Sequence, residues 1–186
     1  IILDLFMKIA KIFLLLLFIQ SCATIPPVDF TVQDVGMVSN RKDVELKSLT
    51  VGFAPKSQQK VIELLPGPDF ASLWKEGLQD SINRSLIFKD DQDTKINLSV
   101  RITELTFFGL EPTTKTSAIY EIIDRSNGDL LFAQEITSEG IVPISHAFLG
   151  NIRLLESVNR SVRNNIADFI NILELADLSN PVFKGE

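Results

Sequence analysis

The alternation of apolar and polar residues between Thr94 and Phe107 constrains the fold of this chain more than any other stretch. A period of two places successive side chains on opposite faces of a β-strand. The apolar face consists of Ile96, Leu98, Val100 and Ile102, and the polar face of Lys95, Asn97, Ser99, Arg101 and Thr103. Such a strand belongs in a sheet that has one face in water and one face covered by an apolar partner.

Two amphipathic stretches can cover that sheet. Asp69 follows Pro66-Gly67-Pro68 and stands where a helix N-cap is expected. The pattern predicts a helix of about 17 residues from there, with its apolar stripe at spacings of three and four. A longer helix is predicted from Ala147 to about Leu173 by the same spacing. The first stripe contains Phe70, Leu73, Trp74, Leu78, Ile82 and Leu86, and the second Phe148, Ile152, Leu155, Val158, Val162, Ile166, Phe169 and Leu173.

Shorter patterns predict further strands. Val28 to Gln33 alternates, and so does Val44 to Phe53, whose phase slips near Ser48 as it would at a β-bulge or a break. The apolar run from Val61 to Leu65 is interpreted as a short strand. Asn127-Gly128 joins two further strands, 118–124 and 130–139, and this dipeptide is a strong hairpin signal because both residues tolerate positive φ.

The order of these elements predicts an α+β fold, in which an antiparallel sheet of about four to six strands packs against two helices on one face. We expect a single domain over residues 28–173, followed by a polar tail, residues 174–186, that frays. The chain has no internal repeat, which argues against a solenoid. The net charge of −6 argues against a nucleic-acid partner, because nucleic-acid binding needs clustered Lys and Arg.

The segment from Met7 to Thr24 has the pattern of a secretory signal. Lys8 and Lys11 precede an uninterrupted apolar run, 12–19, and this run gives way to Gln20, Ser21 and then Cys22. The alternative is a membrane-spanning helix, but charges interrupt the longer apolar region, and the uncharged run is much shorter than the roughly 20 residues that a span needs. We therefore expect residues 1–21 to be a signal peptide, with residues 1–6 upstream of the true start at Met7, and residues 22–27 to form a linker.

The end of this segment resembles a bacterial lipobox, with Ser21 before the cut and Cys22 as the first mature residue. The resemblance implies cleavage between Ser21 and Cys22, a diacylglycerol on the Cys22 thiol and an acylated amino group. Ala23, in place of Asp, implies transfer to the outer membrane. Two or more acyl chains hold a protein stably to a bilayer, so the membrane is the partner that this prediction names.

Catalytic patterns are weak by comparison. His146 is the only histidine and follows Ser145, but adjacent residues do not form a nucleophile–base pair, and no Gly-x-Ser-x-Gly motif is present. A zinc site is not expected from one His and one Cys, and no glycine-rich phosphate loop precedes either helix. Arg153, Arg160 and Arg163 could form a basic stripe, but Glu156 and Asp168 favour an ordinary exposed face. We expect no catalytic residues, no metal and no cofactor.

Residues 69–88 and 147–170 resemble small Gram-negative envelope lipoproteins of the YajG-like type, and more distantly LptE-like and ABC-transport auxiliary lipoproteins. The resemblance implies a lipid-tethered periplasmic domain that assists an envelope complex. Our first hypothesis is therefore a non-catalytic accessory or assembly component with an unidentified protein partner. The alternatives are a lipid- or glycan-binding module and a UDP-N-acetylglucosamine acyltransferase-like enzyme, a name that some proteins of similar ending carry. True acyltransferases of that type resemble hexapeptide-repeat β-helices, and this chain lacks such repeats.

Overall fold

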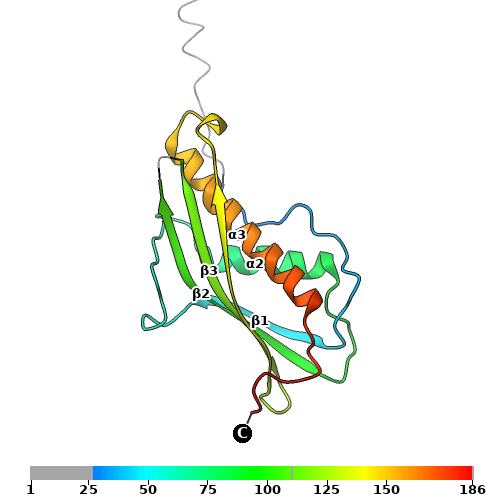
Figure 1. Ribbon diagram of the computed structural model, residues 1–186. Helices are drawn as coiled ribbons and strands as arrows, with labels where there is room; N and C mark the ends of the chain where they lie inside the picture. The colour runs from blue at the N-terminus through cyan, green and yellow to red at the C-terminus, as the bar shows by residue number, and fades with distance from the viewer. Residues whose placement is uncertain (1–26, 110, 186) are drawn as a thin grey trace, which may run out of the picture.

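The computed structural model describes residues 27–109 and 111–185 and shows an α+β fold. In chain order its elements are β1 (Glu45–Phe53), α2 (Phe70–Ser85), β2 (Lys95–Phe108), β3 (Thr113–Asp124), β4 (Leu130–Ile141), a short 3₁₀ helix (Ile144–His146) and α3 (Gly150–Leu175), as Figure 1 shows. The four strands form one sheet in the order β1-β2-β3-β4.

The sheet is mixed, so the prediction of a purely antiparallel sheet is wrong in one pairing. β2, β3 and β4 pair antiparallel, whereas β1 pairs parallel with β2. The physical reason is the crossover through α2, which carries the chain back to the starting end of β1 before β2 begins. The phase slip near Ser48 is a register shift between Leu46 and Ser48, which confirms the predicted bulge.

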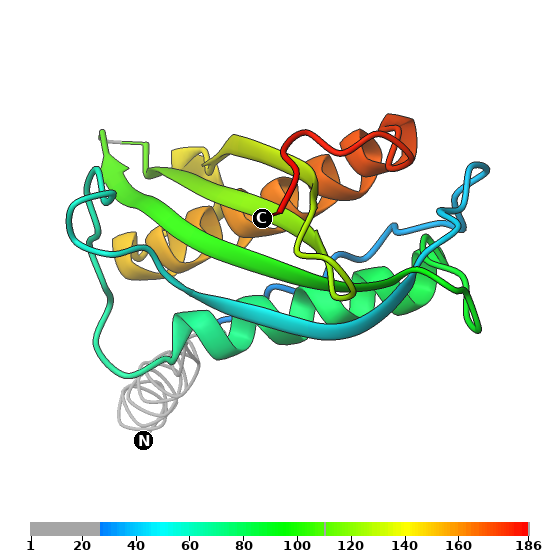
Figure 2. The same ribbon diagram turned by 90° about the horizontal axis from the view of Figure 1, so that it is seen from below.

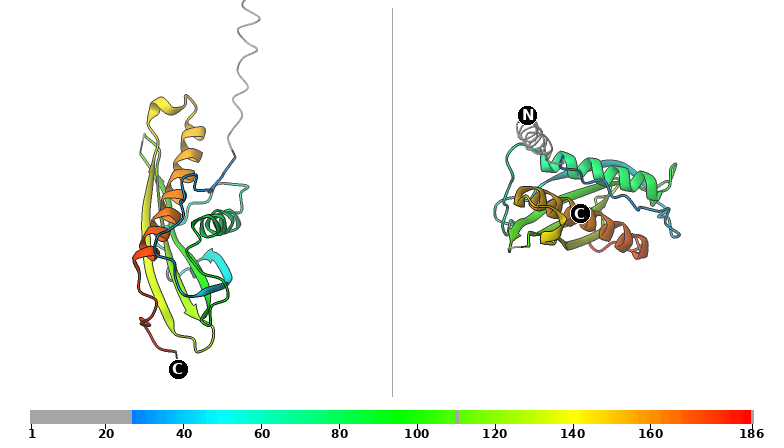
Figure 3. Two further views of the ribbon diagram at one scale, coloured as in Figure 1. Left: turned by 90° about the vertical axis from the view of Figure 1, so that its right-hand side faces the viewer. Right: turned by 90° about the horizontal axis from the view of Figure 1, so that it is seen from above.

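Both helices cover the same face of the sheet, as predicted (Figures 2 and 3). α3 lies over β3 and β4, and α2 lies over β1 beside α3. The centre of the core is aromatic: Tyr120 of β3 stacks on Phe169 of α3 with a centroid distance of 4.2 Å, and Trp74 of α2 donates to the Tyr120 hydroxyl. Aromatic burial of this kind supplies much of the packing energy of a single small core.

A polar seam joins β3 to α3 inside this core. We define it as Thr114, Thr116 and Tyr120 on β3, with Ser157, Ser161 and Asn165 on α3; all six side chains are buried. The paired oxygens are 2.7 Å apart for Thr114–Ser157, 2.9 Å for Thr116–Ser161 and 2.8 Å for Tyr120–Asn165. Because buried polar groups cost free energy unless they are hydrogen-bonded, the seam fixes the position of α3 along β3.

Two predicted strands are absent. Residues 28–33 form no strand and instead cross the helices, with Phe30 buried against Phe70 and Trp74. Gly77 of α2 allows this crossing, because a Cβ there would collide with the Phe30 backbone. Residues 61–65 form no full strand, but they run parallel beside β2 through an isolated bridge between Ile62 and Leu105 and the backbone hydrogen bonds that join Val61 and Glu63 to Leu105.

The end of the chain also differs from expectation. The predicted fraying of the tail is wrong for its described part, because Phe183 forms a bridge with Leu130 and the Gly185 amide donates to Asp129. α2 and the hairpin at Asn127-Gly128 are confirmed, and Asp69 is the N-cap that accepts from the Ser72 amide. α3 begins at Gly150 and not at Ala147, a shift that leaves Phe148 outside the helix.

Candidate functional site

Large apolar side chains lie exposed at one end of the domain, where β2 and β4 end and α3 begins. We call this end the apolar tip and define it as Phe108, Ile141, Ile144, Phe148 and Leu149. Phe148 is 97% exposed, more than any other large apolar side chain in the described residues. Single exposed apolar residues are ordinary, but a group of them at one end of a domain marks a contact surface.

The strand register assembles the first part of the tip. Phe108 of β2 pairs with Thr113 of β3, which in turn pairs with Ile141 of β4. Residues paired directly across a sheet share a face, and this row lies on the face opposite to the helices. Ile141 and Phe108 are therefore exposed on the outer face, at the edge that adjoins the connection from β4 to α3.

Two arginines hold the rest of the tip in place. Arg153 donates to the carbonyls of Ala147 and Phe148 at 2.6 and 3.0 Å, and Arg160 donates to the carbonyl of Ile141 at 3.0 Å. These bonds bind both ends of the 141–149 connection to the first three turns of α3. The backbone that carries Phe148 is thus braced against α3, because each charged donor satisfies backbone acceptors that would otherwise pair with water.

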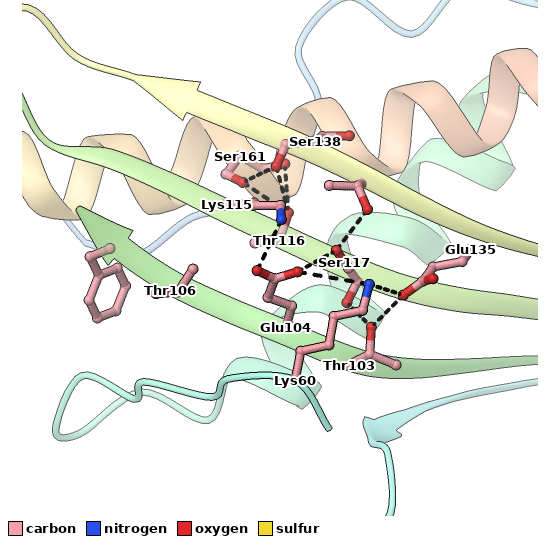
Figure 4. A network of polar contacts seen from close by, with 12 residues as sticks. Lys60, Thr103, Glu104, Thr106, Lys115, Thr116, Ser117, Glu135, Ser138 and Ser161 are labelled. Carbon is pink, nitrogen blue, oxygen red and sulfur yellow. Dashed lines mark hydrogen bonds and ion pairs between the residues drawn. The ribbon is translucent and has the colours of Figure 1, made fainter. Parts of the chain in front are cut away.

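A network of ion pairs crosses the outer face of the sheet below the tip (Figure 4). The nearly buried Glu104 carboxylate accepts from Ser117 and pairs with Lys115 at 3.1 Å. Lys60 pairs with Glu135 at 2.8 Å, and Thr103 donates to the same carboxylate. The network joins β2, β3, β4 and the segment after β1, and its two lysines balance its two carboxylates.

The charges in this network stabilise one another. The hydrogen bond from Lys60 has the largest effect on the Glu135 carboxyl and, with smaller contributions from the Thr103 hydrogen bond and the Lys60 charge, holds its pKa below its usual range against the opposing effect of burial. The same bond raises the pKa of the Lys60 ammonium. A general acid or base near neutral pH would need its pKa moved towards 7, and Glu135 is moved away from it. The network is therefore suited to holding strands together.

A cleft of about 590 Å³ lies at the opposite end, around the C-terminus of α3. Lys42 is buried there and donates to the carbonyls of Glu174 and Ala176, where a cation complements the negative end of the helix dipole. Burial lowers the pKa of Lys42 despite the nearby carboxylates. Hydrogen bonds from Ser179 and Asn180 lower the pKa of Asp177 to about 2. The polar groups of this cleft thus stabilise the C-terminal end of α3.

A second hollow, the N-terminal groove, is apolar and lies beside the start of the described chain. Its walls are Val28, Leu65, Pro66, Pro68, Asn151, Leu154 and Leu155, and its volume is about 480 Å³. Val28 therefore packs near the first turns of α3, and the next residues are held there as well, since the Asp29 amide donates to Asn159 and its carboxylate pairs with Arg163 at 3.2 Å. The groove lies at the same end of α3 as the apolar tip.

The residues singled out from the sequence fall into three groups. Ser21 and Cys22 lie outside the described residues. Ser145 and His146 are both exposed in the short 3₁₀ helix, and neither side chain forms a hydrogen bond within the described part of the chain. Arg153, Arg160 and Arg163 are all partly buried, and they bond to the Ala147 carbonyl, to Glu156 and to Asp29 respectively.

The apolar tip was missed in the sequence. Phe148 stands four residues before Ile152, so the helical spacing assigned it to the buried stripe of α3. Gly150 and Pro143 were the available signals, because glycine is a poor helix former and proline disfavours helix for the residue before it. Within the described residues, no three His, Cys, Asp or Glu side chains are grouped so as to hold a metal ion. None of the described helices is both long and apolar enough to cross a bilayer.

Neither a family model nor a curated protein matches the chain. Among solved structures it is similar to a DUF330 protein from Xanthomonas campestris, with a TM-score of 0.50 and 11% identity over 81% of this chain and 93% of that one. A hypothetical protein from Chlamydia trachomatis has a TM-score of 0.49 and 10% identity, covering 70% of this chain and 95% of that one. A candidate lipoprotein from Caulobacter crescentus has a TM-score of 0.42 and 9% identity, covering 72% and 89% respectively. The similarity to the DUF330 protein shows a shared fold.

Proposed function

We propose that the protein is a lipid-anchored, non-catalytic component of the bacterial envelope, held to the outer membrane through Cys22 and active through protein contacts. The observation that carries the proposal is the segment from Lys8 to Cys22, in which a basic start, an apolar run and a small residue precede the only cysteine. A domain braced by buried polar bonds and balanced ion pairs suits a structural or assembly role.

Metabolic labelling with an alkyne analogue of palmitate tests the anchor. We expect the label on the wild-type chain and its loss in Cys22→Ser, which keeps the size of the side chain but cannot form the thioether. Ser21→Ala is the matched control and should keep the label, because a small residue still precedes the cut. A wild-type chain that takes up no label would overturn the anchor.

The outer membrane and its periplasmic face form the finer part of the proposal. Separation of the two membranes by density should place the labelled protein with outer-membrane markers. Protease should digest the domain only after the outer membrane is opened. Recovery with the inner membrane would contradict the assignment that Ala23 implies.

Crosslinking in intact envelopes tests the role in protein contacts. A photoreactive residue at Ala133 on the exposed outer side of β4 should yield one defined heteromeric product, whereas the same residue at the exposed Lys56 serves as a control on the loop after β1. Recovery of the uncrosslinked monomer from both positions would count against an assembly role.

The N-terminal groove favours a second candidate, a lipid-binding module. Its apolar walls could hold one acyl chain, since ligand sites are usually apolar hollows of some 300–1,000 Å³. Native mass spectrometry of the purified protein should then detect a bound lipid. Leu155→Trp should fill the groove and remove that lipid, whereas Leu175→Trp at the far, exposed end of α3 should not.

A further inference from the structure

We propose that the apolar tip inserts into the interface of the bilayer to which the chain is tethered, so that the protein contacts the membrane at a second point and stands on it in one orientation. This inference rests on the proposed lipid anchor at Cys22. Its own support comes from the described residues of the tip and from the place where the described chain begins.

The composition of the tip fits a membrane interface. The exposed residues Ile144, Phe148 and Leu149 lie in the 141–149 connection. The exposed residues Ile141 and Phe108 lie at the ends of β4 and β2. Phe and Leu are among the apolar residues that interfacial membrane contacts use. Arg153 and Arg160 lie directly behind the tip, bonded to the carbonyls of the connection.

The length of the linker selects this end of the domain. The carbonyl of Pro27 accepts from Asn159, and Pro27 stands five positions after Cys22 in the sequence. Five residues span about 17 Å when fully extended. Gly150, the first residue of α3, precedes Asn159 by nine residues, a rise of about 14 Å along the helix, whereas Leu175 follows Asn159 by sixteen residues, or about 24 Å. A lipid on Cys22 can therefore lie beside the tip but cannot reach the other end of α3.

The bracing of the tip matters because an exposed phenyl ring on a mobile loop could fold back onto the protein. Here the backbone of the connection is bonded to α3 at both ends, and the Phe148 side chain is 97% exposed. An anchor and a rigid apolar contact at the same end would together limit the tilt of the domain. The outer sheet face would then stand at a defined angle to the bilayer.

The test uses single-cysteine labelling of the full-length, membrane-processed protein in vesicles of phosphatidylethanolamine and phosphatidylglycerol. Cys22 is the only cysteine, so an acylated chain leaves no other thiol to react. Phe148→Cys receives a polarity-sensitive fluorophore, and Met37→Cys is the matched control. Met37 is also exposed and apolar, but it lies against Asn171 and Glu174 at the far half of α3.

We expect the fluorophore at position 148 to shift to the blue on reconstitution and to be quenched by doxyl-labelled phospholipid, while the one at position 37 does neither. Equal, water-like emission at both positions would overturn the inference while leaving the anchor intact. A blue shift at 148 without quenching by doxyl lipid would assign the tip to a protein contact, such as a second copy of the chain, and would also overturn it. Labelling of the unsubstituted protein at Cys22 would instead show that the anchor itself is absent.

Discussion

Gly140 of β4 lies where the sheet and α3 approach each other closely. A Cβ at this position would collide with the backbone of Ser157 and Ser161, which no rotamer change can relieve. The close approach also allows the Ser161 hydroxyl to donate to the carbonyl of Ser138 at 2.9 Å. One glycine therefore sets the spacing on which the polar seam depends.

We predict that Gly140→Ala lowers the free energy of unfolding by about 1–3 kcal/mol, the usual cost of overpacking a dense interior. Urea unfolding followed by far-ultraviolet circular dichroism measures the change. Gly52→Ala in β1 is the matched control, because a Cβ there meets nothing within 4 Å. A midpoint for Gly140→Ala equal to that of the control would show that α3 can move away from β4 at little cost.

The hydroxyl of Tyr120 lies between two buried partners, Trp74 and Asn165. Burial raises the pKa of the Tyr120 phenol, so the group stays protonated and can donate. Tyr120→Phe should lower the free energy of unfolding by about 1–3 kcal/mol, because Asn165 then loses its donor in a buried place. Urea midpoints of the wild type, Tyr120→Phe, Asn165→Ala and the double variant complete a double-mutant cycle, which measures the coupling between the two side chains. Additive effects in that cycle would show that the two side chains are not coupled.

At the scale of the elements, the start of α2 illustrates how a local signal acts. Asp69 accepts from the amide and the hydroxyl of Ser72, at 3.2 and 2.8 Å, and these bonds lower the pKa of the Asp69 carboxyl. Asp69→Ala should lower the urea midpoint because two donors of the first turn lose their acceptor. Asp69→Asn keeps an oxygen acceptor and should retain most of the stability. Equal losses in the two variants would assign the effect to charge and not to capping.

The elements that could be predicted from the sequence are those whose cause is local. The stripe from Phe70 to Ile82 and the turn at Asn127-Gly128 depend on residues a few positions apart, and both are found. The parallel pairing of β1 with β2 depends on the end of the sheet to which the connection through α2 returns the chain. The periodicity of apolar residues carries no information about that end. Phe30 lies in a stretch whose alternation is typical of a strand, but its side chain is buried against helices from elsewhere in the chain. The tip was hidden because Phe148 satisfies the helical spacing and the helix begins later.

At the scale of the whole molecule, the outer-face network connects strands on the face of the sheet that the helices do not cover. Lys60 comes from the segment after β1, Glu135 from β4, and Thr103 lies between them on β2. The pair is partly exposed, with 50% of the Lys60 side chain and 41% of the Glu135 side chain accessible. Exposed pairs of this kind contribute only about 0.2–1 kcal/mol.

The network predicts how the stability of the whole domain varies with pH. Because the hydrogen bond from Lys60 lowers the pKa of Glu135 in the folded state, the pair stabilises the fold above the usual value of 4.5 and loses this effect as the pH falls through the lowered pKa. The pKa of Lys60 is raised, so the effect is also lost as the pH rises above 10.5. The difference in unfolding free energy between wild type and Glu135→Gln should therefore be largest between these two pH limits, at about 0.2–1 kcal/mol. Below the lower limit and above the upper one, this difference should disappear.

Urea midpoints at pH 3, 7 and 11 measure this difference. Glu76→Gln is the matched control, because it removes the same charge from an exposed site on α2, away from the network, and Glu76 forms no ion pair within the described residues. The control should show no maximum near neutral pH. A similar profile for both variants would mean that net charge, and not the bond from Lys60 across three strands, sets the pH dependence. The outer face would then be free of internal constraint and available in full to a partner.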